Sequence, residues 1–226
     1  MKGAYRHLAR DRPSSQPKAA LRGSHIAYAL EHLATKNPAW DLRANALLAT
    51  AYCTMARRAE LVALRVEDLS FNAEAGDGVA LIRNTKAGRE ESRYLSREAV
   101  TRLKAWLENA KVKEEAVFRR FTPMGTIGPS AIAPQEVTRI IQRVGDLLNA
   151  ERDPTAPVWP REHVAAHSTR IGAAHDLAAN GIDLTSIMHS GGWNDPKMPR
   201  YYTRELAARK SGMARMMKAR NENTRS

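Results

Sequence analysis

The stretch HSTRIGAAHDLAANGIDLTSIMHSGGWNDPKMPRYYTRE, residues 167–205, decides how this chain is interpreted. It begins with His167 and Arg170, passes Trp193 and ends just after Tyr202. A folded core does not need these four side chains between short helical segments. Together they supply a proton acceptor, a cation, a further N–H donor and an oxygen nucleophile, which is what an attack on a phosphate requires.

Helical patterns surround this stretch. Residues from about Ser168 to Ala179 form a predicted helix that the Asn-Gly pair at 180–181 can end. Upstream, Asp41 can cap a helix whose core stripe recurs at i, i+3, i+4 and i+7, at Leu48, Ala51, Tyr52 and Met55. The same reasoning predicts further helices over residues 25–35, 97–110 and 134–150.

One segment has a different pattern. Apolar residues between Val79 and Leu95 flank a polar turn at Lys86–Gly88, which predicts a β-hairpin. The Pro- and Gly-containing segments 122–134 and 152–160 are expected to be loops. The predicted fold class is therefore mainly α with a small antiparallel β-hairpin or sheet.

Charge is concentrated at the two ends of the 226-residue chain, whose net charge is +12. Residues 1–22 hold six Lys or Arg against one Asp, and residues 204–226 hold seven against two Glu. Two basic ends on a nearly neutral body fit arms that lie along a polyanion such as DNA. Two solvated tails explain the charge equally well.

The composition also indicates the cellular compartment. Cys53 is the single cysteine and lies in an apolar run, as expected of a buried thiol in a reducing compartment. The N-terminus lacks the apolar region of a secretory signal, and no apolar run approaches the ~20 residues of a membrane span. A soluble cytoplasmic protein is expected, associated with the nucleoid if it binds DNA.

Two arginines at predicted helix starts are candidates for binding an anion. Arg57 and Glu60 are three residues apart and can pair on one helix face, which in isolation is most often a surface ion pair. His167 and Arg170 have the same spacing. Two such arginines can converge on one phosphate, each offering a planar donor fork.

Three other side chains have both a structural and a chemical interpretation. Lys86 at an exposed turn is usually solvated, but next to DNA it can give a proton to a leaving oxygen. Trp193 can anchor a core or donate its indole N–H to a phosphate oxygen. Tyr202 can be a packed aromatic, or a nucleophile if cations stabilise its anion.

Other chemistries have less support. His163 and His167 have the i, i+4 spacing of metal ligands, but Val164 stands where a metalloprotease helix needs Glu. The sequence contains no P-loop and no serine in a nucleophile elbow. We expect neither a metal nor another cofactor.

Taken together, the motifs resemble the catalytic domain of the tyrosine recombinase, or phage integrase, family. The resemblance rests on AYCTMARRAELVALRVEDLS, on NTKAG, and on the stretch from His167 to Tyr202, in that order. It covers roughly residues 40 to 217. The implied domains are a basic arm at 1–23, the catalytic domain at 24–204, and a C-terminal basic helix and tail at 205–226.

The resemblance also implies roles for individual residues. The implied catalytic residues are Arg57, Lys86, His167, Arg170, Trp193 and Tyr202, with Glu60 in support. Trp193 stands where most members have the histidine of an LGH motif. Arg58 and Tyr201 compete for two of these roles, but the RxxE motif selects Arg57, and a nine-residue step from Trp193 selects Tyr202.

The implied activity is site-specific cleavage and rejoining of double-stranded DNA through a 3′-phosphotyrosine, without metal or ATP. The implied assembly is a tetramer on paired DNA sites and a monomer without DNA. The methionines of the last helical segment, Met213, Met216 and Met217, share one face and are expected to dock on a neighbouring protomer, or else on the chain's own core.

Two alternatives stay open. A type IB topoisomerase uses the same chemistry without choosing a site, and a DNA-binding regulator with a decayed site would not cut DNA. The filled catalytic positions argue against the regulator. Family members usually have a helical DNA-clamping domain before the catalytic domain, whereas only an arm precedes it here. Either the chain is a fragment or another component clamps the DNA.

Overall fold

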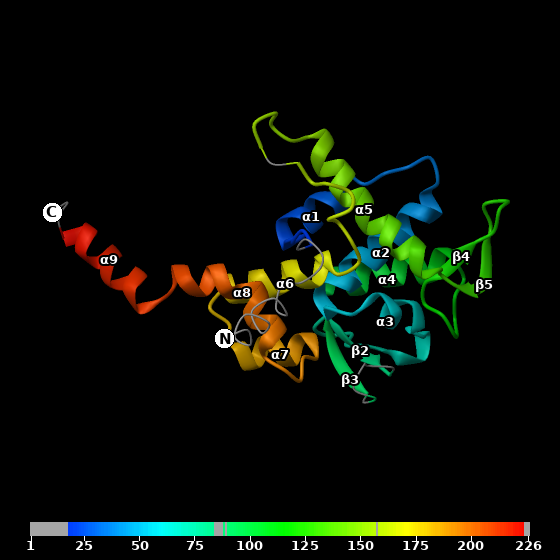
Figure 1. Ribbon diagram of the computed structural model, residues 1–226. Coiled ribbons are helices and arrows are strands. Elements are labelled where there is room, and N and C mark those ends of the chain that lie inside the picture. The colour runs from blue at the N-terminus through cyan, green and yellow to red at the C-terminus, as the bar shows by residue number, and fades with distance from the viewer. Residues whose placement is uncertain (1–17, 84–87, 89, 157, 224–226) are drawn as a thin grey trace, which may run out of the picture.

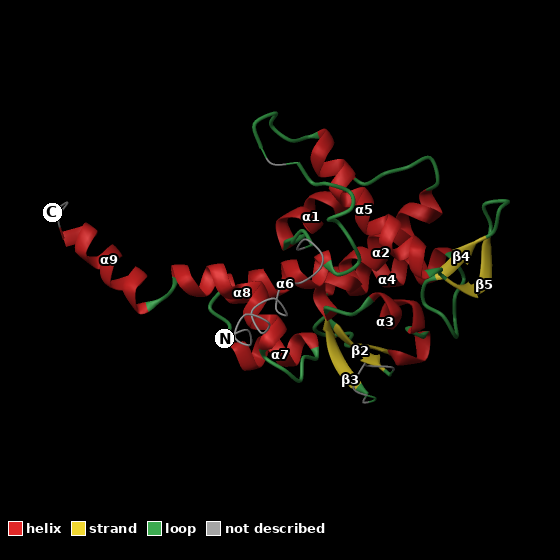
Figure 2. Ribbon diagram, in the orientation of Figure 1, coloured by secondary structure: helices red, strands yellow, loops and turns green. Residues whose placement is uncertain are grey.

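The computed structural model describes residues 18–83, 88, 90–156 and 158–223, which form helices and two small antiparallel sheets joined by loops (Figures 1 and 2). The helices are α1 (Gly23–His32), α2 (Pro38–Thr54), α3 (Arg58–Ala63), the 3-10 turn η1 (Val66–Asp68), α4 (Arg97–Asn109), α5 (Pro134–Ala150), α6 (Ser168–Ala179), α7 (Leu184–Gly191), α8 (Lys197–Arg209) and α9 (Gly212–Asn223). The strands are β1 (Leu69–Phe71), β2 (Gly78–Ile82), β3 (Glu91–Leu95), β4 (Arg119–Phe121) and β5 (Ile127–Ala131).

Helix α2 forms the centre of the core. It packs against α1, α4, α5, α6 and β3, and it is buried on several faces because alanine and leucine occupy most of its middle. Of the predicted stripe, Leu48, Ala51 and Met55 are buried and Tyr52 is half-buried. The predicted cap is wrong: Asn37 caps α2 by accepting from the Trp40 N–H at 3.1 Å.

The predicted hairpin is confirmed as β2 and β3, and β1 adds a third strand that the sequence did not reveal. A three-residue strand is too short to show an alternating pattern. In the β2–β3 register Ala80 faces Arg93, and both side chains are buried. Lys86, at the predicted hairpin tip, lies outside the described residues.

The loop expected over residues 122–134 is in fact a second hairpin. Strand β4 pairs with β5, and the Thr122 N–H donates to the Thr126 carbonyl at 2.8 Å across the turn. Gly125 supplies the left-handed backbone of that turn, with φ +79°. Gly128 and Pro129 lie within β5 and interrupt the strand pattern in the sequence, which explains the wrong prediction.

The site-bearing helices pack on one side of this core. Helix α6 packs against α2, α7 and α8, and it ends at Ala179 as predicted, with Gly181 at φ +83°. Residues 18–22, the last part of the predicted arm, pack against the start of α6: Leu21 is buried, and its N–H donates to the Ser168 carbonyl at 3.0 Å. Helix α9 extends away from the body beyond the end of α8 (Figure 1).

Candidate active site

The first turn of α6 places a buried arginine beside a histidine. His167 is the residue before the helix and Arg170 lies within its first turn. The Arg170 side chain is fully buried, and its Nη1 donates to the Met55 carbonyl. Its Nε and Nη2 have no hydrogen-bond partner among the described residues. A buried N–H donor without a partner can bind an acceptor such as a phosphate oxygen.

The end of α2 and the start of α3 bring the second arginine to the same place. Met55 ends α2 in the left-handed conformation, φ 51°, which turns the chain toward α3. Arg57 precedes α3 and pairs with Glu60, whose carboxylate accepts from the Arg57 N–H at 2.7 Å and from Nη1 at 2.6 Å. Because Glu60 is buried, it holds the Arg57 guanidinium in one orientation.

Tyr202 lies on α8 with its hydroxyl against His167. The distance from Tyr202 Oη to His167 Nε2 is 2.7 Å. Burial raises the pKa of Tyr202, an effect that the nearby Arg170 opposes. Burial, followed by the charges of Arg170 and Arg57, lowers the pKa of His167 to about 4. At neutral pH the imidazole is therefore uncharged, and its ring nitrogen can accept a hydrogen bond from the phenol.

Two glycines bring Trp193 over Arg170. Gly192 ends α7 in the left-handed conformation, φ 60°, and Gly191 lies so close to the indole that a Cβ there would overlap the ring. The Arg170 Cζ lies 3.9 Å from the centroid of a Trp193 ring. The indole therefore stacks on the guanidinium as well as lining the site.

These side chains share one cavity of about 560 Å³. It is lined by Arg57, Glu91, His167, Arg170, Gly192, Trp193, Asn194, Asp195, Lys197, Met198 and Tyr202. Five of the six predicted catalytic residues thus converge, and Glu60 lies directly behind Arg57. The sixth, Lys86, lies outside the described residues. The cavity can hold an anion between two guanidinium groups, next to a nucleophile and its proton acceptor.

The competing residues face elsewhere. Arg58 is exposed and its Nη1 donates to the Thr138 hydroxyl of α5 at 3.3 Å. The Arg204 guanidinium carbon lies 4.2 Å from the ring centroid of Tyr201. The geometry therefore favours Arg57 and Tyr202 at the cavity. Within the described ranges, no group of three or more His, Cys, Asp or Glu side chains is placed to hold a metal ion.

Sequence reasoning missed two charged residues on β3. Glu91 lines the cavity, and Arg93 is buried beside it. Arg93 stands in the alternating pattern of β3 at a position where an apolar residue is expected, and that mismatch is the signal that could have revealed it.

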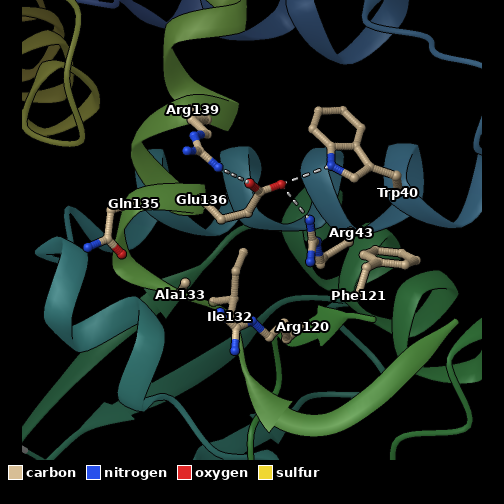
Figure 3. A pocket seen from close by; sticks show the side chains of 9 residues that line it. All are labelled: Trp40, Arg43, Arg120, Phe121, Ile132, Ala133, Gln135, Glu136 and Arg139. Carbon is tan, nitrogen blue, oxygen red and sulfur yellow. Dashed lines mark hydrogen bonds and ion pairs between the residues drawn. The ribbon is translucent and has the colours of Figure 1, made fainter. Parts of the chain in front are cut away.

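A second pocket, of about 430 Å³, lies between α2, the β4–β5 hairpin and the start of α5 (Figure 3). Its Glu136 carboxylate accepts from Trp40 Nε1 at 3.1 Å and from Arg43 Nη2 at 3.0 Å. Burial lowers the pKa of Arg43 to about 10. This ion pair between a buried arginine and a half-buried glutamate ties α5 to α2, and it is separate from the cavity around Tyr202.

Comparison with known sequences supports the resemblance. The sequence profile of the phage integrase family matches residues 21–209. The recombinase cre of Escherichia phage P1 is 29% identical over 192 residues, covering 78% of this chain and 53% of that protein. An integrase/recombinase xerD homolog of Selenomonas ruminantium is 26% identical over 186 residues, covering 77% and 51%. The chain spans about half the length of these curated relatives.

Solved structures show the same fold. The XerH site-specific recombinase bound to a palindromic difH substrate in a post-cleavage complex superposes with a TM-score of 0.68 at 19% identity, over 90% of this chain and 54% of that one. A lambda integrase dimer bound to a COC′ core site gives 0.54 at 16% identity, over 87% and 51%. The mainly helical architecture with small antiparallel sheets predicted from the sequence is thereby confirmed.

Proposed function

This chain belongs to the phage integrase family and has the tyrosine recombinase catalytic-domain fold, and from that premise we propose that it is the catalytic part of a site-specific DNA recombinase. It cleaves and rejoins double-stranded DNA through a 3′-phosphotyrosine at Tyr202. The observation that carries the proposal is the hydrogen bond between the Tyr202 hydroxyl and the His167 imidazole, in a cavity shared with Arg57 and Arg170.

The site is suited to binding and activating a phosphodiester. A phosphate oxygen satisfies the buried Nε and Nη2 donors of Arg170, and Arg57 contributes a second guanidinium that Glu60 holds in place. The phosphate carries one negative charge before attack and about two in the transition state. Fixed cations therefore stabilise the transition state more than the bound substrate, and each such donor contributes about two to three orders of magnitude in rate.

The covalent step balances without an external energy source. Tyr202 Oη forms a bond to phosphorus while the bond from phosphorus to the 5′ oxygen breaks. Neutral His167 accepts the phenol proton, and Lys86 gives a proton to the leaving 5′ oxygen. The phosphotyrosine ester retains the bond energy, so attack by a 5′ hydroxyl rejoins a strand. The two guanidinium groups and Trp193 perform the electrostatic work in this mechanism, with no metal and no ATP.

Double-stranded DNA is the proposed partner. The XerH neighbour is bound to a difH substrate and the lambda integrase neighbour to a COC′ core site, and 29% identity to the recombinase cre supports the same class of substrate. Basic residues at both ends of the chain are suited to contacting phosphates along the duplex. We expect a protein that acts on DNA in this way to lie in the cytoplasm with the nucleoid.

A second copy of the chain is the proposed partner of α9. Met213, Met216 and Met217 are exposed there by 64%, 57% and 45%. Lys210, just before α9, donates through Nζ to the carbonyls of Ala178 and Ala179 at the end of α6, both at 2.6 Å. Lys210 thus fixes the chain to α6 just before α9, and α9 then projects with its methionines exposed. This arrangement supports docking of α9 on a neighbouring copy, as in a tetramer on paired sites.

Covalent capture tests the proposed function. The protein is incubated with a library of random-sequence nicked duplexes, in which the short product diffuses away and traps the intermediate, and protein-linked DNA is recovered and sequenced. We expect a defined set of sites. Tyr202→Phe is expected to abolish capture with nearly unchanged DNA affinity, since only the hydroxyl is lost. Tyr201→Phe is the matched control and should still capture DNA.

The capture result also separates the alternatives. Capture without any preferred sequence would indicate a topoisomerase-like strand cutter, and binding without capture would indicate a DNA-binding regulator. If Tyr201→Phe lost capture while Tyr202→Phe kept it, the assignment of the nucleophile would be wrong.

A further inference from the structure

Arg93 is a buried cation in the middle of β3. Only 2% of its side chain is exposed. Its Nη1 donates to two backbone carbonyls that belong to different parts of the fold, Thr54 at the end of α2 at 3.1 Å and Ser190 near the end of α7 at 2.8 Å. A single guanidinium group therefore ties the sheet to both α2 and α7.

Each of these carbonyls leads directly into the candidate active site. Thr54 is followed by Met55, whose carbonyl accepts from Arg170. Ser190 is followed by the glycine pair that carries Trp193, and the Gly192 carbonyl accepts from Arg57 Nη2 at 3.4 Å. Arg93 thus fixes two backbone segments whose relative position sets where both catalytic arginines lie.

Arg93 also pairs with a carboxylate in the wall of the cavity. Glu91, at the start of β3, lines the cavity with 23% of its side chain exposed and accepts from Arg93 Nη2. The pair lies against Gly192, where an added Cβ would overlap both Arg93 Nη2 and Glu91 Oε2. An unpaired Glu91 at this point would repel a phosphate anion.

We propose that Glu91 and Arg93 form a positioning pair for the scissile phosphate. Arg93 holds the Gly192–Trp193 turn against the end of α2 and keeps the Glu91 carboxylate neutralised at the cavity wall. The inference rests on the proposed function, because it concerns how the same cavity receives a phosphate. Neither residue touches the reacting atoms.

Charge and packing make distinguishable contributions to this role. Loss of Arg93 leaves Glu91 as an uncompensated negative charge that repels the phosphate. This repulsion disappears when the phosphate is made neutral. A purely structural loss slows charged and neutral substrates alike. The charge of Arg93 reaches the site, since after burial and Arg57 it is the next cause that lowers the pKa of Arg170 to about 9.

The test uses nicked duplexes that carry a site recovered by covalent capture, made with either a normal phosphodiester or an uncharged methylphosphonate at the scissile position. Wild type, Arg93→Met, Glu91→Gln and the double variant are compared in single-turnover cleavage, thermal unfolding and DNA affinity. Arg43→Met is the matched control, because Arg43 is also a buried arginine paired with a glutamate, in the separate pocket of Figure 3.

Arg93→Met is expected to slow cleavage of the phosphodiester about 100-fold, as loss of an electrostatic stabiliser does. The slowing should be less than about tenfold on the methylphosphonate, and adding Glu91→Gln should recover about tenfold on the phosphodiester, because the two residues are coupled. Arg43→Met should lower stability while leaving the ratio of the two rates unchanged.

Equal slowing of both substrates by Arg93→Met, or no recovery in the double variant, would overturn the positioning pair. If Arg93→Met does not fold, Arg93→Lys takes its place. Its ammonium can neutralise Glu91 but cannot reach both carbonyls, so about tenfold slowing on both substrates is expected, and wild-type rates would overturn the proposal. A wild type that captures no DNA overturns the proposed function itself, whereas normal wild-type cleavage beside a failed Arg93 prediction overturns only this inference.

Discussion

At the scale of single residues, the candidate site depends on how two arginines and a histidine are held. Arg57 and Arg170 come from helix starts that are more than 100 residues apart in the chain, and each is fixed by a backbone or carboxylate partner before any substrate arrives. Fixed donors need little reorganisation when charge develops, which is the main advantage of such a site over water.

Replacing Arg57 with lysine tests this dependence on geometry. An ammonium keeps the charge but cannot pair with Glu60 and also offer a planar fork to a phosphate. We expect Arg57→Lys to slow single-turnover cleavage by about two orders of magnitude while DNA affinity changes little. Arg58→Lys, at the exposed neighbour, is the control and should cleave normally. Undiminished cleavage by Arg57→Lys would move the assignment to Arg58.

His167 gives a prediction about pH. Its folded-state pKa of about 4 lies below the ordinary value of 6.5, so the unfolded chain takes up a proton at a higher pH than the folded one does. Stability from this group is complete above pH 6.5 and is lost as the pH falls toward 4, by on the order of 2–3 kcal/mol.

Urea denaturation at pH 7 and pH 4.5 checks this dependence. His167→Gln should lose less unfolding free energy between the two pH values than wild type does, because glutamine does not titrate and all other groups are shared. An equal loss in the two proteins would mean that His167 is not held neutral in the folded state.

At the scale of elements, the sequence predicted what local patterns encode. The α2 stripe, the β2–β3 hairpin and the end of α6 follow from apolar spacing and from the Asn-Gly stop signal. The β4–β5 hairpin did not, because Gly128 and Pro129 interrupt its alternation. Convergence of Arg57 with His167 followed from the family resemblance. The role of Arg93 could not be predicted, because its partners Thr54 and Ser190 are close to β3 only in the folded chain.

The contact between α6 and residues 18–22 gives a prediction at this scale. Gly172 faces Leu21 so closely that a Cβ would overlap the Leu21 carbonyl. We expect Gly172→Ala to lower the unfolding free energy by about 1–3 kcal/mol, despite the better helix propensity of alanine, because overpacking outweighs it. Gly212→Ala at the start of α9 is the control, since no described heavy atom lies within 4 Å of its added Cβ. Equal stability of the two variants in urea denaturation would show that residues 18–22 do not pack tightly on α6.

At the scale of the whole molecule, α9 lies apart from the candidate active site. The candidate active-site cavity is lined by residues up to Tyr202, whereas the exposed methionines lie beyond residue 211, on a helix that projects from the body (Figure 1). Nothing in the described cavity requires α9. These positions favour an arrangement in which the body folds and cleaves without α9. The helix then serves only to join copies of the chain.

Truncation after Lys210 tests that arrangement and keeps the lysine that caps α6. The truncated protein is expected to attach covalently to a single half-site and to keep an unfolding free energy close to that of wild type. Its assembly on paired sites, measured by gel shift and light scattering, is expected to fail. Replacing Met213, Met216 and Met217 with serine should reproduce the assembly defect because it removes only the apolar face. Arg215→Gln with Lys218→Gln on the same helix controls for lost charge and should still assemble. If truncation instead unfolded the body, α9 would be packing on its own chain, and the proposed exchange between copies would be wrong.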